Sequence, residues 1–317
     1  MFQKIIHTDV LIIGASASGL ICAIEAGKRG RKVIILDHAN KAAKKILMSG
    51  GGRCNFTNYQ IDADNYISHN PHFCKSALSR FNQWDFIAMV ERHQIPYQER
   101  DLGKLFCQNR AKDIVNMLLT ECQQYAVDIH LKCKIKQVQK QPQKGFLITT
   151  AEGLFKTTSL VIASGGLSIP KMCASPFGYQ IAEQFGHHIW QTSAGLVPFT
   201  LHQKDKDQFA SLSGIALKAT VSNQRIQFNE NILFTHRGLS GPAILQISSY
   251  WQAGETITIN LLPDLDLLAW LQQARQESAN IKLKTSLHQL LPKSLITCFL
   301  KSPACILRPE PFEIYQL

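Results

Sequence analysis

The stretch Asp9-Val-Leu-Ile-Ile-Gly14-Ala-Ser-Ala-Ser-Gly19-Leu-Ile-Cys-Ala-Ile-Glu-Ala-Gly27 predicts a buried strand, a glycine-marked turn and a helix. A second apolar run over residues 33–36 ends at Asp37, which follows Gly19 by 18 residues, where the dinucleotide-binding fingerprint has an acid after roughly 20. In such a βαβ unit the helix N-terminus offers unpaired N–H groups to a pyrophosphate, and the carboxylate accepts from a ribose hydroxyl. The stretch therefore predicts a nucleotide-binding βαβ unit.

One position in this stretch departs from the fingerprint. Ser16 stands where the middle glycine of G-x-G-x-x-G normally lets the backbone approach the pyrophosphate. A plain buried strand–helix turn is the alternative interpretation of the same residues.

Length and composition indicate a soluble chain with a large core. The chain has 317 residues, 45% of them hydrophobic, which is long enough for two domains. No apolar run reaches the roughly 18 residues of a membrane span, so we expect no membrane association. The nine cysteines are scattered and include no C-x-x-C pair, which favours reduced thiols in a cytoplasmic protein over disulfides or a zinc site. We expect no metal.

The formal net charge of +11 is the strongest hint of a charged partner. Basic residues gather in two clusters: Lys28, Arg29, Arg31 and Lys32, then Lys41, Lys44 and Lys45. Such clusters attract polyanions, either nucleic acid or a phosphate-rich cofactor, but they also occur at ordinary solvated helix ends. Since no zinc-finger spacing or aromatic RNA-binding signature accompanies them, we do not expect nucleic acid as a partner.

Periodicity along the chain predicts an α/β region followed by a β-rich one. We expect helices over residues 71–81, 82–93, 111–125 and 177–185, and strands over 127–131, 135–138, 145–150, 154–158 and 160–163. Beyond about residue 190 we expect strands over 196–201, 215–221, 225–228, 232–235 and 256–261, and helices over 243–250, 264–277 and 283–291. The tail over 301–317 resembles a continuation of neither region.

Four blocks stand out along the chain: Gly14-Ala-Ser-Ala-Ser-Gly19, Lys45-Ile-Leu-Met-Ser-Gly-Gly-Gly-Arg-Cys-Asn55, Val161-Ile-Ala-Ser-Gly-Gly166 and Phe234-Thr-His-Arg-Gly-Leu-Ser-Gly-Pro242. In this order they resemble the bacterial aminoacetone-oxidase-like FAD-dependent flavoproteins, which include reductases linked to bile-acid metabolism. The resemblance implies an α/β fold: a glutathione-reductase-like, Rossmann-type FAD-binding domain over residues 1–189, an inserted β-barrel over 190–262 and a small helical section over 263–300.

The same resemblance implies which residues hold FAD. The pyrophosphate would face Gly14, Ala15, Ser16, Ala17, Ser18 and Gly19, and the adenosine ribose would meet Asp37, next to His38. Ile135 would hold the adenine through its main chain. The flavin ring would lie beside the second block, with Lys45, Ser49, Gly50, Gly51, Gly52, Arg53, Cys54 and Asn55. The return strand would contribute Ala163, Ser164, Gly165 and Gly166.

The chain departs from the family pattern in two ways. Ser16 and Ala43 replace glycines. Family members also continue with a segment that carries a Gly-Glu and a Gly-Gly-Tyr-Asn-Phe-Gln run and closes the FAD domain, whereas nothing like it follows Phe299 here. This pattern predicts a truncated member.

Few protein groups are candidates for catalysis. His236, in the fourth block, could act as an acid or base because imidazole titrates near neutrality, or it could cap the adjacent helix or contact a backbone carbonyl. Cys54 could be a reactive thiol, although no second cysteine lies near it in the sequence. His187 and His188 lack a third metal ligand. With no second G-x-G-x-x-G block, NAD(P)H is a candidate only as a transient electron donor.

Three hypotheses follow. The leading one is an FAD-dependent oxidoreductase that transfers hydride between the flavin and a small organic substrate. The alternative is a truncated, catalytically impaired remnant of such a flavoprotein. The third, a nucleic-acid-associated flavoprotein, rests on the charge alone. The sequence does not indicate the oligomeric state.

Overall fold

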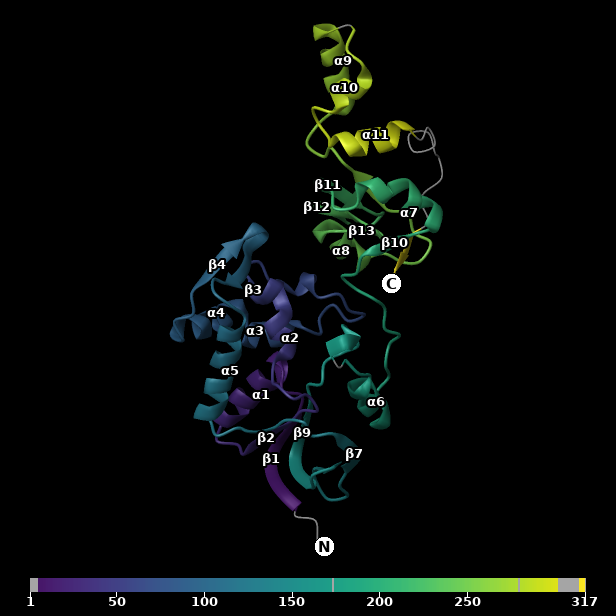
Figure 1. The fold of residues 1–317 in the computed structure, drawn as a ribbon. Helices are drawn as coiled ribbons and strands as arrows, with labels where there is room; N and C mark the ends of the chain where they lie inside the picture. Colours follow the sequence, from purple (N-terminus) through teal and green to yellow (C-terminus); the bar gives the residue numbers. More distant parts are fainter. Residues whose placement is uncertain (1–4, 173, 279, 302–313, 317) are drawn as a thin grey trace. The chain divides into compact units, whose positions relative to one another are not determined.

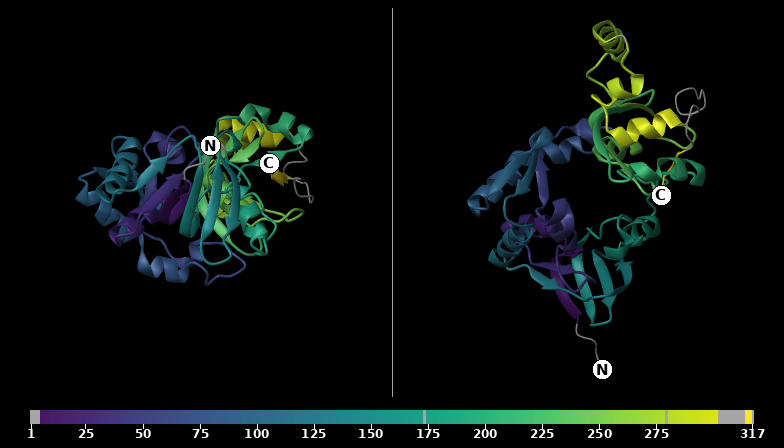
Figure 2. Two further views of the ribbon diagram at one scale, coloured as in Figure 1. Left: turned by 90° about the horizontal axis from the view of Figure 1, so that it is seen from below. Right: turned by 45° about the horizontal axis from the view of Figure 1, so that its top comes forward.

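The computed structural model describes residues 5–172, 174–278, 280–301 and 314–316, which form two compact units, Met1–Trp190 and Gln191–Leu317. The first unit is built on a six-stranded sheet with strand order β6-β2-β1-β9-β8-β7. Its strands are β1 (Ile5–Ile13), β2 (Val33–Leu36), β6 (Asp128–His130), β7 (Ile135–Lys140), β8 (Phe146–Thr150) and β9 (Leu154–Ile162). Strands β6, β2, β1 and β9 are parallel, and β8 and β7 continue the sheet as an antiparallel hairpin. Strand β1 (purple) lies beside β9 (teal) in Figure 1 and in the left view of Figure 2.

Alternate residues of the central strands pack on opposite faces of the sheet, because successive side chains of a strand point in opposite directions. On one face Ile12 and Ile35 pack with the helices α1 (Ala17–Lys28) and α5 (Lys112–Gln124). On the other face Leu11 and Ile34 pack with the hairpin and with α6 (Phe177–Gln184). Burial on both faces explains why β2 and residues 10–13 of β1 are continuous apolar runs. The predicted βαβ unit and the α/β fold class are confirmed.

A smaller antiparallel sheet follows the glycine-rich block in the first unit. It has the order β3-β5-β4, formed by β3 (Asn55–Asn58), β4 (Tyr97–Arg100) and β5 (Lys104–Cys107). Three helices accompany it: α2 (Lys44–Met48), α3 (Lys75–Arg80) and α4 (Gln83–Arg92). Helix α4 begins where the sequence predicts, because the Asn82 side chain accepts from the Trp84 and Asp85 backbone N–H groups and Asp85 accepts from the Asn82 N–H.

The second unit contains one antiparallel sheet with the order β14-β11-β12-β13-β10-β15. Its strands are β10 (Phe199–Leu201), β11 (Ala216–Ser222), β12 (Gln227–Thr235), β13 (Gly238–Ser240), β14 (Thr258–Asn260) and β15 (Ile314–Gln316). Its helices are α7 (Gln203–Phe209), α8 (Pro242–Ser248), α9 (Leu267–Glu277), α10 (Leu283–Leu287) and α11 (Lys293–Lys301). Buried side chains of β10, β12 and α8, among them Phe199, Ile232 and Ile247, form the core.

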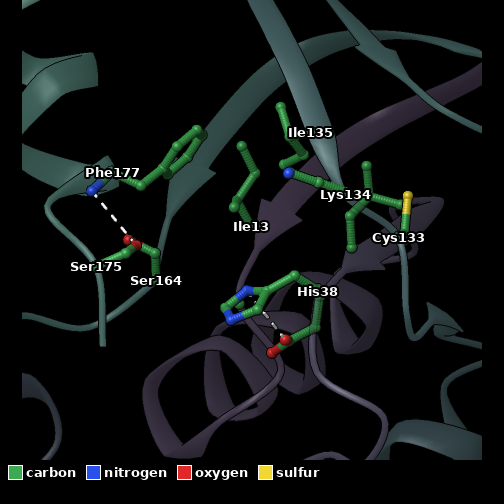
Figure 3. Close-up of a pocket in the computed structure, with 11 residues that line it drawn as sticks. Ile13, His38, Cys133, Lys134, Ile135, Ser164, Ser175 and Phe177 are labelled. Atoms are coloured by element: carbon green, nitrogen blue, oxygen red, sulfur yellow. Dashed lines mark hydrogen bonds and ion pairs between the residues drawn. The ribbon is translucent and has the colours of Figure 1, made fainter. Parts of the chain in front are cut away.

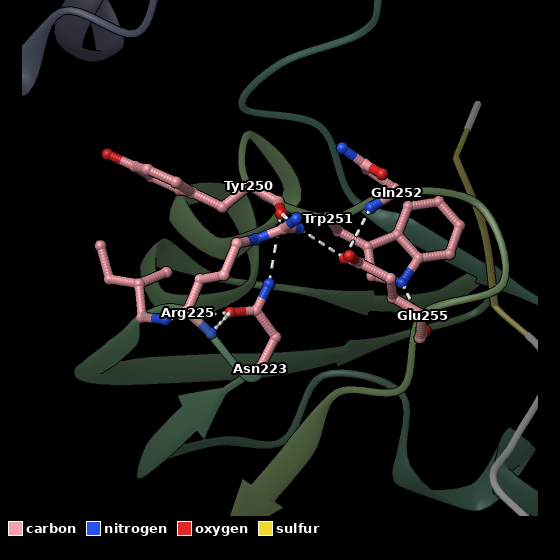
Figure 4. Close-up of polar contacts among 7 residues, drawn as sticks. Asn223, Arg225, Tyr250, Trp251, Gln252 and Glu255 are labelled. Atoms are coloured by element: carbon pink, nitrogen blue, oxygen red, sulfur yellow. Dashed lines mark hydrogen bonds and ion pairs between the residues drawn. The ribbon is translucent and has the colours of Figure 1, made fainter.

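Polar contacts fasten the β11–β12 turn to the segment after α8 (Figure 4). The Arg225 guanidinium donates to the Tyr250 carbonyl and lies 2.6 Å from Glu255 Oε2. Asn223 Nδ2 donates to the same carbonyl over 3.2 Å. These bonds satisfy a carbonyl just beyond the helix end, where a cation is also favourable.

The structure differs from the sequence expectations at several elements. The strands expected over residues 154–158 and 160–163 form the single strand β9, in which Ser159 pairs with Val10. The strands expected over 225–228 and 232–235 are likewise one, because the polar residues between them pair with β11. Residues 314–316 of the expected tail add a strand to the sheet of the second unit, and the remainder, 302–313 and 317, lies outside the described residues. Among the described helices, none is long and apolar enough to cross a membrane.

A buried carboxylate joins α4 to α5. Glu121 is 3% exposed, and its Oε1 lies 2.7 Å from His93 Nε2 and 3.3 Å from an Arg92 guanidinium nitrogen. Burial pushes the pKa of Glu121 up, but the hydrogen bonds and charges of His93 and Arg92 outweigh it and hold the pKa below its usual value. Because the pKa of Glu121 is lower in the folded than in the unfolded state, the ionised carboxylate stabilises the protein at pH values above the unfolded-state pKa. This stabilisation is lost as the pH falls through the folded-state pKa.

Glu121→Gln should therefore destabilise the protein at neutral pH by about 1–3 kcal/mol and flatten the fall in stability below about pH 5. Thermal melts between about pH 4 and pH 7 measure both effects. Glu25→Gln is the control, because Glu25 forms only a surface pair with Lys28 over 2.8 Å, worth well under 1 kcal/mol. Equal losses in the two variants would contradict a structural role for Glu121.

Candidate functional site

The turn after β1 is held by two glycines that leave no space for a side chain. Gly14 has φ +116°, and a Cβ built on it would lie 2.2 Å from the Ala163 carbonyl oxygen. A Cβ on Gly19 would lie 1.9 Å from the Gly14 carbonyl oxygen. Both glycines are therefore required for the turn to pack between α1 and the end of β9.

The first turn of α1 is open to solvent. Ser16 is its N-cap residue, with φ −112° and no side-chain capping bond, and Ala17 and Ser18 are exposed. A helix N-terminus of this kind carries a partial positive charge and unpaired N–H groups. Serine fits the backbone at position 16 without strain, so the departure from the fingerprint leaves the fold of the turn intact. The turn can still bind an anion such as a pyrophosphate.

The Asp37 carboxylate is fixed by backbone groups on both sides. Its Oδ2 accepts from the Ala15 N–H over 2.7 Å, and its Oδ1 accepts from the Ala39 N–H over 2.7 Å. His38 Nδ1 lies 3.7 Å from Oδ1. Because a carboxylate oxygen can accept more than one hydrogen bond, the half-buried Asp37 can still accept from a ligand hydroxyl.

A cavity of about 480 Å³ opens at the carboxyl ends of β1, β2 and β9 (Figure 3). This edge is where doubly wound sheets bind their ligands. Five of the residues predicted to bind the cofactor line it: Gly14, Asp37, His38, Ile135 and Ser164. Six more lining residues were not predicted: Ile13, Leu36, Cys133, Lys134, Ser175 and Phe177. The apolar walls with a carboxylate at one side suit a purine nucleoside.

Ser164 supplies an independent test of whether the cavity fits a cofactor. Its Oγ is buried and has no hydrogen-bond partner among the described residues. It lies 3.0 Å from where a Cβ on Gly178 would stand, so α6 approaches it closely. An unpaired buried hydroxyl costs about 1–3 kcal/mol, a cost that a polar ligand group in the cavity would offset. The residues present therefore fit the adenosine-diphosphate part of FAD.

The glycine-rich second block takes an unusual backbone course. Gly50, Gly51 and Gly52 have φ values of +57°, +65° and +84°, and Cys54 has φ +49°. A Cβ on Gly50 would lie 2.6 Å from the Asn55 nitrogen. None of residues 49–55 lines the described cavity. Their place beside the flavin ring stays a prediction.

Two contacts connect the predicted blocks. The Ala43 N–H donates to the Ala15 carbonyl over 2.8 Å, which joins the segment before α2 to the turn between β1 and α1. Lys45 Nζ donates to the Ser168 carbonyl over 3.1 Å, just beyond the return-strand residues 163–166. Ala43 has φ +56°, a conformation that favours glycine and explains why the resembling family has glycine there.

The fold brings Cys54 next to a cysteine that is distant in the sequence. The Cys107 N–H, on β5, donates to the Cys54 carbonyl over 3.4 Å, and both residues are buried. Burial raises the pKa of the Cys54 thiol, so it is protonated at neutral pH and is a poor nucleophile there.

His236 lies in the second unit and is exposed. With Arg237 it forms the two-residue turn between β12 and β13, where the Thr235 hydroxyl accepts from the Arg237 and Gly238 N–H groups. Because β13 separates His236 from α8, the helix-capping alternative is wrong. A catalytic role stays a prediction. Among the described residues, no cluster of three or more potential ligands could hold a metal ion.

Comparison with known proteins gives matches over most of the chain. The family models of the HI0933-like protein Rossmann domain and of the HI0933-like protein barrel and H2TH domain match residues 8–228 and 193–307. A ribosomal RNA dihydrouridine synthase of Escherichia coli K12 is 50% identical over 91% of this chain and 72% of that protein. One of Haemophilus influenzae is 45% identical over 93% of this chain and 74% of that protein.

Two further likenesses are more distant. A 3-dehydro-bile acid delta(4,6)-reductase of Clostridium scindens is 26% identical over 80% of this chain and 64% of that protein. Among solved structures, the open conformation of a flavocytochrome c3 fumarate reductase aligns with 67% of this chain and 47% of that chain, at 16% identity and a TM-score of 0.43.

Replacing Gly14 with alanine should destabilise the protein by about 3 kcal/mol or more, because the new methyl group meets the Ala163 carbonyl and the backbone is held in the left-handed region. Gly30→Ala is the matched control, since Gly30 also has a positive φ, +69°, but nothing within 4 Å of its Cβ position. It should cost about 1 kcal/mol. Chemical unfolding without added cofactor measures both, and similar losses would show that the close approach does not matter.

Proposed function

Because the chain belongs to the HI0933-like family of FAD-binding Rossmann proteins, we propose that it is an FAD-dependent dihydrouridine synthase that modifies ribosomal RNA. The observation that carries this proposal is the identity of 50% and 45% to two ribosomal RNA dihydrouridine synthases, each over more than 90% of the chain. Each of these two matches therefore includes residues of both units.

FAD binding is the first step of the proposed function, and the described cavity supports it. We assign the pyrophosphate to the open N-terminus of α1, the adenosine ribose to Asp37 and the adenine to the apolar walls near Ile135. Asp37 is already fixed by the Ala15 N–H, so little side-chain freedom is lost when the ribose binds.

The proposed reaction saturates the C5=C6 bond of uridine, which requires a hydride and a proton. When bound, FAD supplies the hydride chemistry. Within the protein, we propose His236 as the proton donor, because its ring is exposed and imidazole exchanges protons near neutral pH. NAD(P)H is the proposed source of electrons and would act transiently.

The surface charge supports an RNA substrate, contrary to the expectation drawn from sequence motifs alone. The net charge is +11, and the basic cluster Lys28, Arg29, Arg31 and Lys32 is exposed. RNA binding through such residues should weaken steeply with added salt, because phosphate contacts release counterions. An RNA substrate also agrees with the proposed location in the cytoplasm.

A small unsaturated organic compound is the second candidate substrate. It is favoured by the 26% identity to the bile-acid reductase over 80% of the chain. Both candidates place the reduction of a carbon–carbon double bond at the flavin, so they differ in the substrate and not in the cofactor chemistry.

The direct test uses the full chain with FAD, NADPH and ribosomal RNA that lacks dihydrouridine. We expect a visible flavin spectrum and a uridine nucleoside that gains two hydrogens by mass spectrometry. His236→Gln should lower the reaction rate by about 10²–10⁴-fold while FAD binding stays unchanged. A flavin spectrum without RNA reduction, but with reduction of a small enone, would replace the RNA proposal with the second candidate.

Ser16→Gly should raise the affinity for FAD. The Ser16 side chain makes no capping bond, so its removal costs only a few tenths of a kcal/mol and allows closer approach of the pyrophosphate. Titration followed by flavin fluorescence compares the two proteins, with Ser76→Gly as the control at an exposed position in the first turn of α3, outside the cavity. Equal or weaker binding by the Ser16 variant would contradict the crowding argument.

A further inference from the structure

Two buried cysteines face each other across the small sheet, at the point where the glycine-rich loop enters it. Strands β3 and β5 pair antiparallel with Asn55 opposite Phe106, and Cys54 and Cys107 are the next residues along the two segments. The Cys107 N–H donates to the Arg53 carbonyl over 2.9 Å and to the Cys54 carbonyl over 3.4 Å, so the two segments stay in hydrogen-bond contact at the cysteines.

The backbone hydrogen bond makes Cys54 and Cys107 direct neighbours, as a disulfide requires. Disulfides join Cα atoms about 4.4–6.8 Å apart. Cys54 and Cys107 are 5% and 0% exposed and belong to the same core cluster, so both side chains point into one interior.

The electrostatics of the pair agree with this arrangement. Burial, the neighbouring Cys54 thiol and Asp113 together raise the pKa of the Cys107 thiol to about 12. Two groups that influence each other's titration in this way lie close together.

The backbone of the loop adds a second, independent observation. Cys54 has φ +49°, where a residue other than glycine, asparagine or aspartate is rare. Strain of this kind persists where the surrounding structure enforces it, and it gathers at functional positions. A Cβ built on Gly50 would lie 2.9 Å from the Phe106 ring, so the loop packs closely against β5, on the face opposite to that of Cys107.

We propose that Cys54 and Cys107 form a reversible disulfide that fastens the glycine-rich loop 49–55 to strand β5. In the reaction the two S–H bonds break and one S–S bond forms. The two protons and two electrons pass to a small two-electron oxidant, either a low-molecular-weight disulfide, which yields two thiols, or a diazene, which yields a hydrazine. Both thiols are protonated in the reduced protein, so the exchange is slow and requires a small reagent that enters the core.

Oxidation of the native, full-length protein with diamide tests this proposal. We expect the protein to lose two hydrogens in mass, to regain them with dithiothreitol, and to yield a Cys54–Cys107 linked peptide on digestion. The oxidised protein should melt at a higher temperature than the reduced one, because the bond constrains the unfolded chain. If both cysteines stay free, or link to other cysteines, in the oxidised protein, the proposal is wrong.

Matched variants separate the pair from the other thiols. Cys54→Ser and Cys107→Ser should each abolish the reversible mass loss, whereas Cys22→Ser, in the half-buried part of α1, should retain it. Melting of the reduced variants shows that they are folded, and the linked peptide from the unaltered protein decides the outcome if one of them is not. A reversible mass loss that persists in both folded pair variants would overturn the assignment.

Discussion

The close approach of Gly14 to the end of β9 is the constraint on which the candidate site depends. The Gly14 N–H donates to the Leu36 carbonyl over 2.9 Å, and the Ala163 N–H donates to the Ile13 carbonyl over 2.8 Å. The ends of three parallel strands thus meet at one residue that has no side chain. Any larger residue would push β9 away from the turn, and with it would move both the mouth of the cavity and the N-terminus of α1.

Asp37 connects this packing to the candidate binding site. Its carboxylate joins the end of β2 to the turn between β1 and α1 through the Ala15 N–H, so the group expected to bind the ribose also holds the residues expected to bind the pyrophosphate. A site whose side chains are already fixed loses less conformational entropy on binding. Acceptance of a ribose hydrogen bond, the role usually given to the acid at this position, is therefore only part of the role of Asp37.

The sequence predicted the central βαβ unit well because both faces of β2 and of the second half of β1, residues 10–13, are buried, which produces unbroken apolar runs. It did not predict the small sheet, since β4, with the sequence Tyr-Gln-Glu-Arg, carries the polar composition of a loop. Six of the eleven residues that line the cavity were missed for a different reason. Among them, Cys133, Lys134 and Ser175 come from connections and Phe177 is the first residue of α6, and only the fold brings them to Gly14. The Cys54–Cys107 contact joins residues 53 positions apart and is equally invisible in the sequence.

The residues that line the cavity all belong to the first unit, and Asp37 and the apolar walls suit a ribose hydroxyl and a flat base, which are common to dinucleotides. Nothing in that set distinguishes an RNA nucleoside from a small organic compound as substrate, because a fold that binds a cofactor supports many reactions. The choice between the two must then depend on other features, namely the basic surface and the exposed His236–Arg237 turn of the second unit. A long polyanion requires many cationic contacts over an extended surface, whereas a small substrate requires few. In the proposal of an RNA substrate, the net charge of +11 is therefore an argument separate from the names of the relatives.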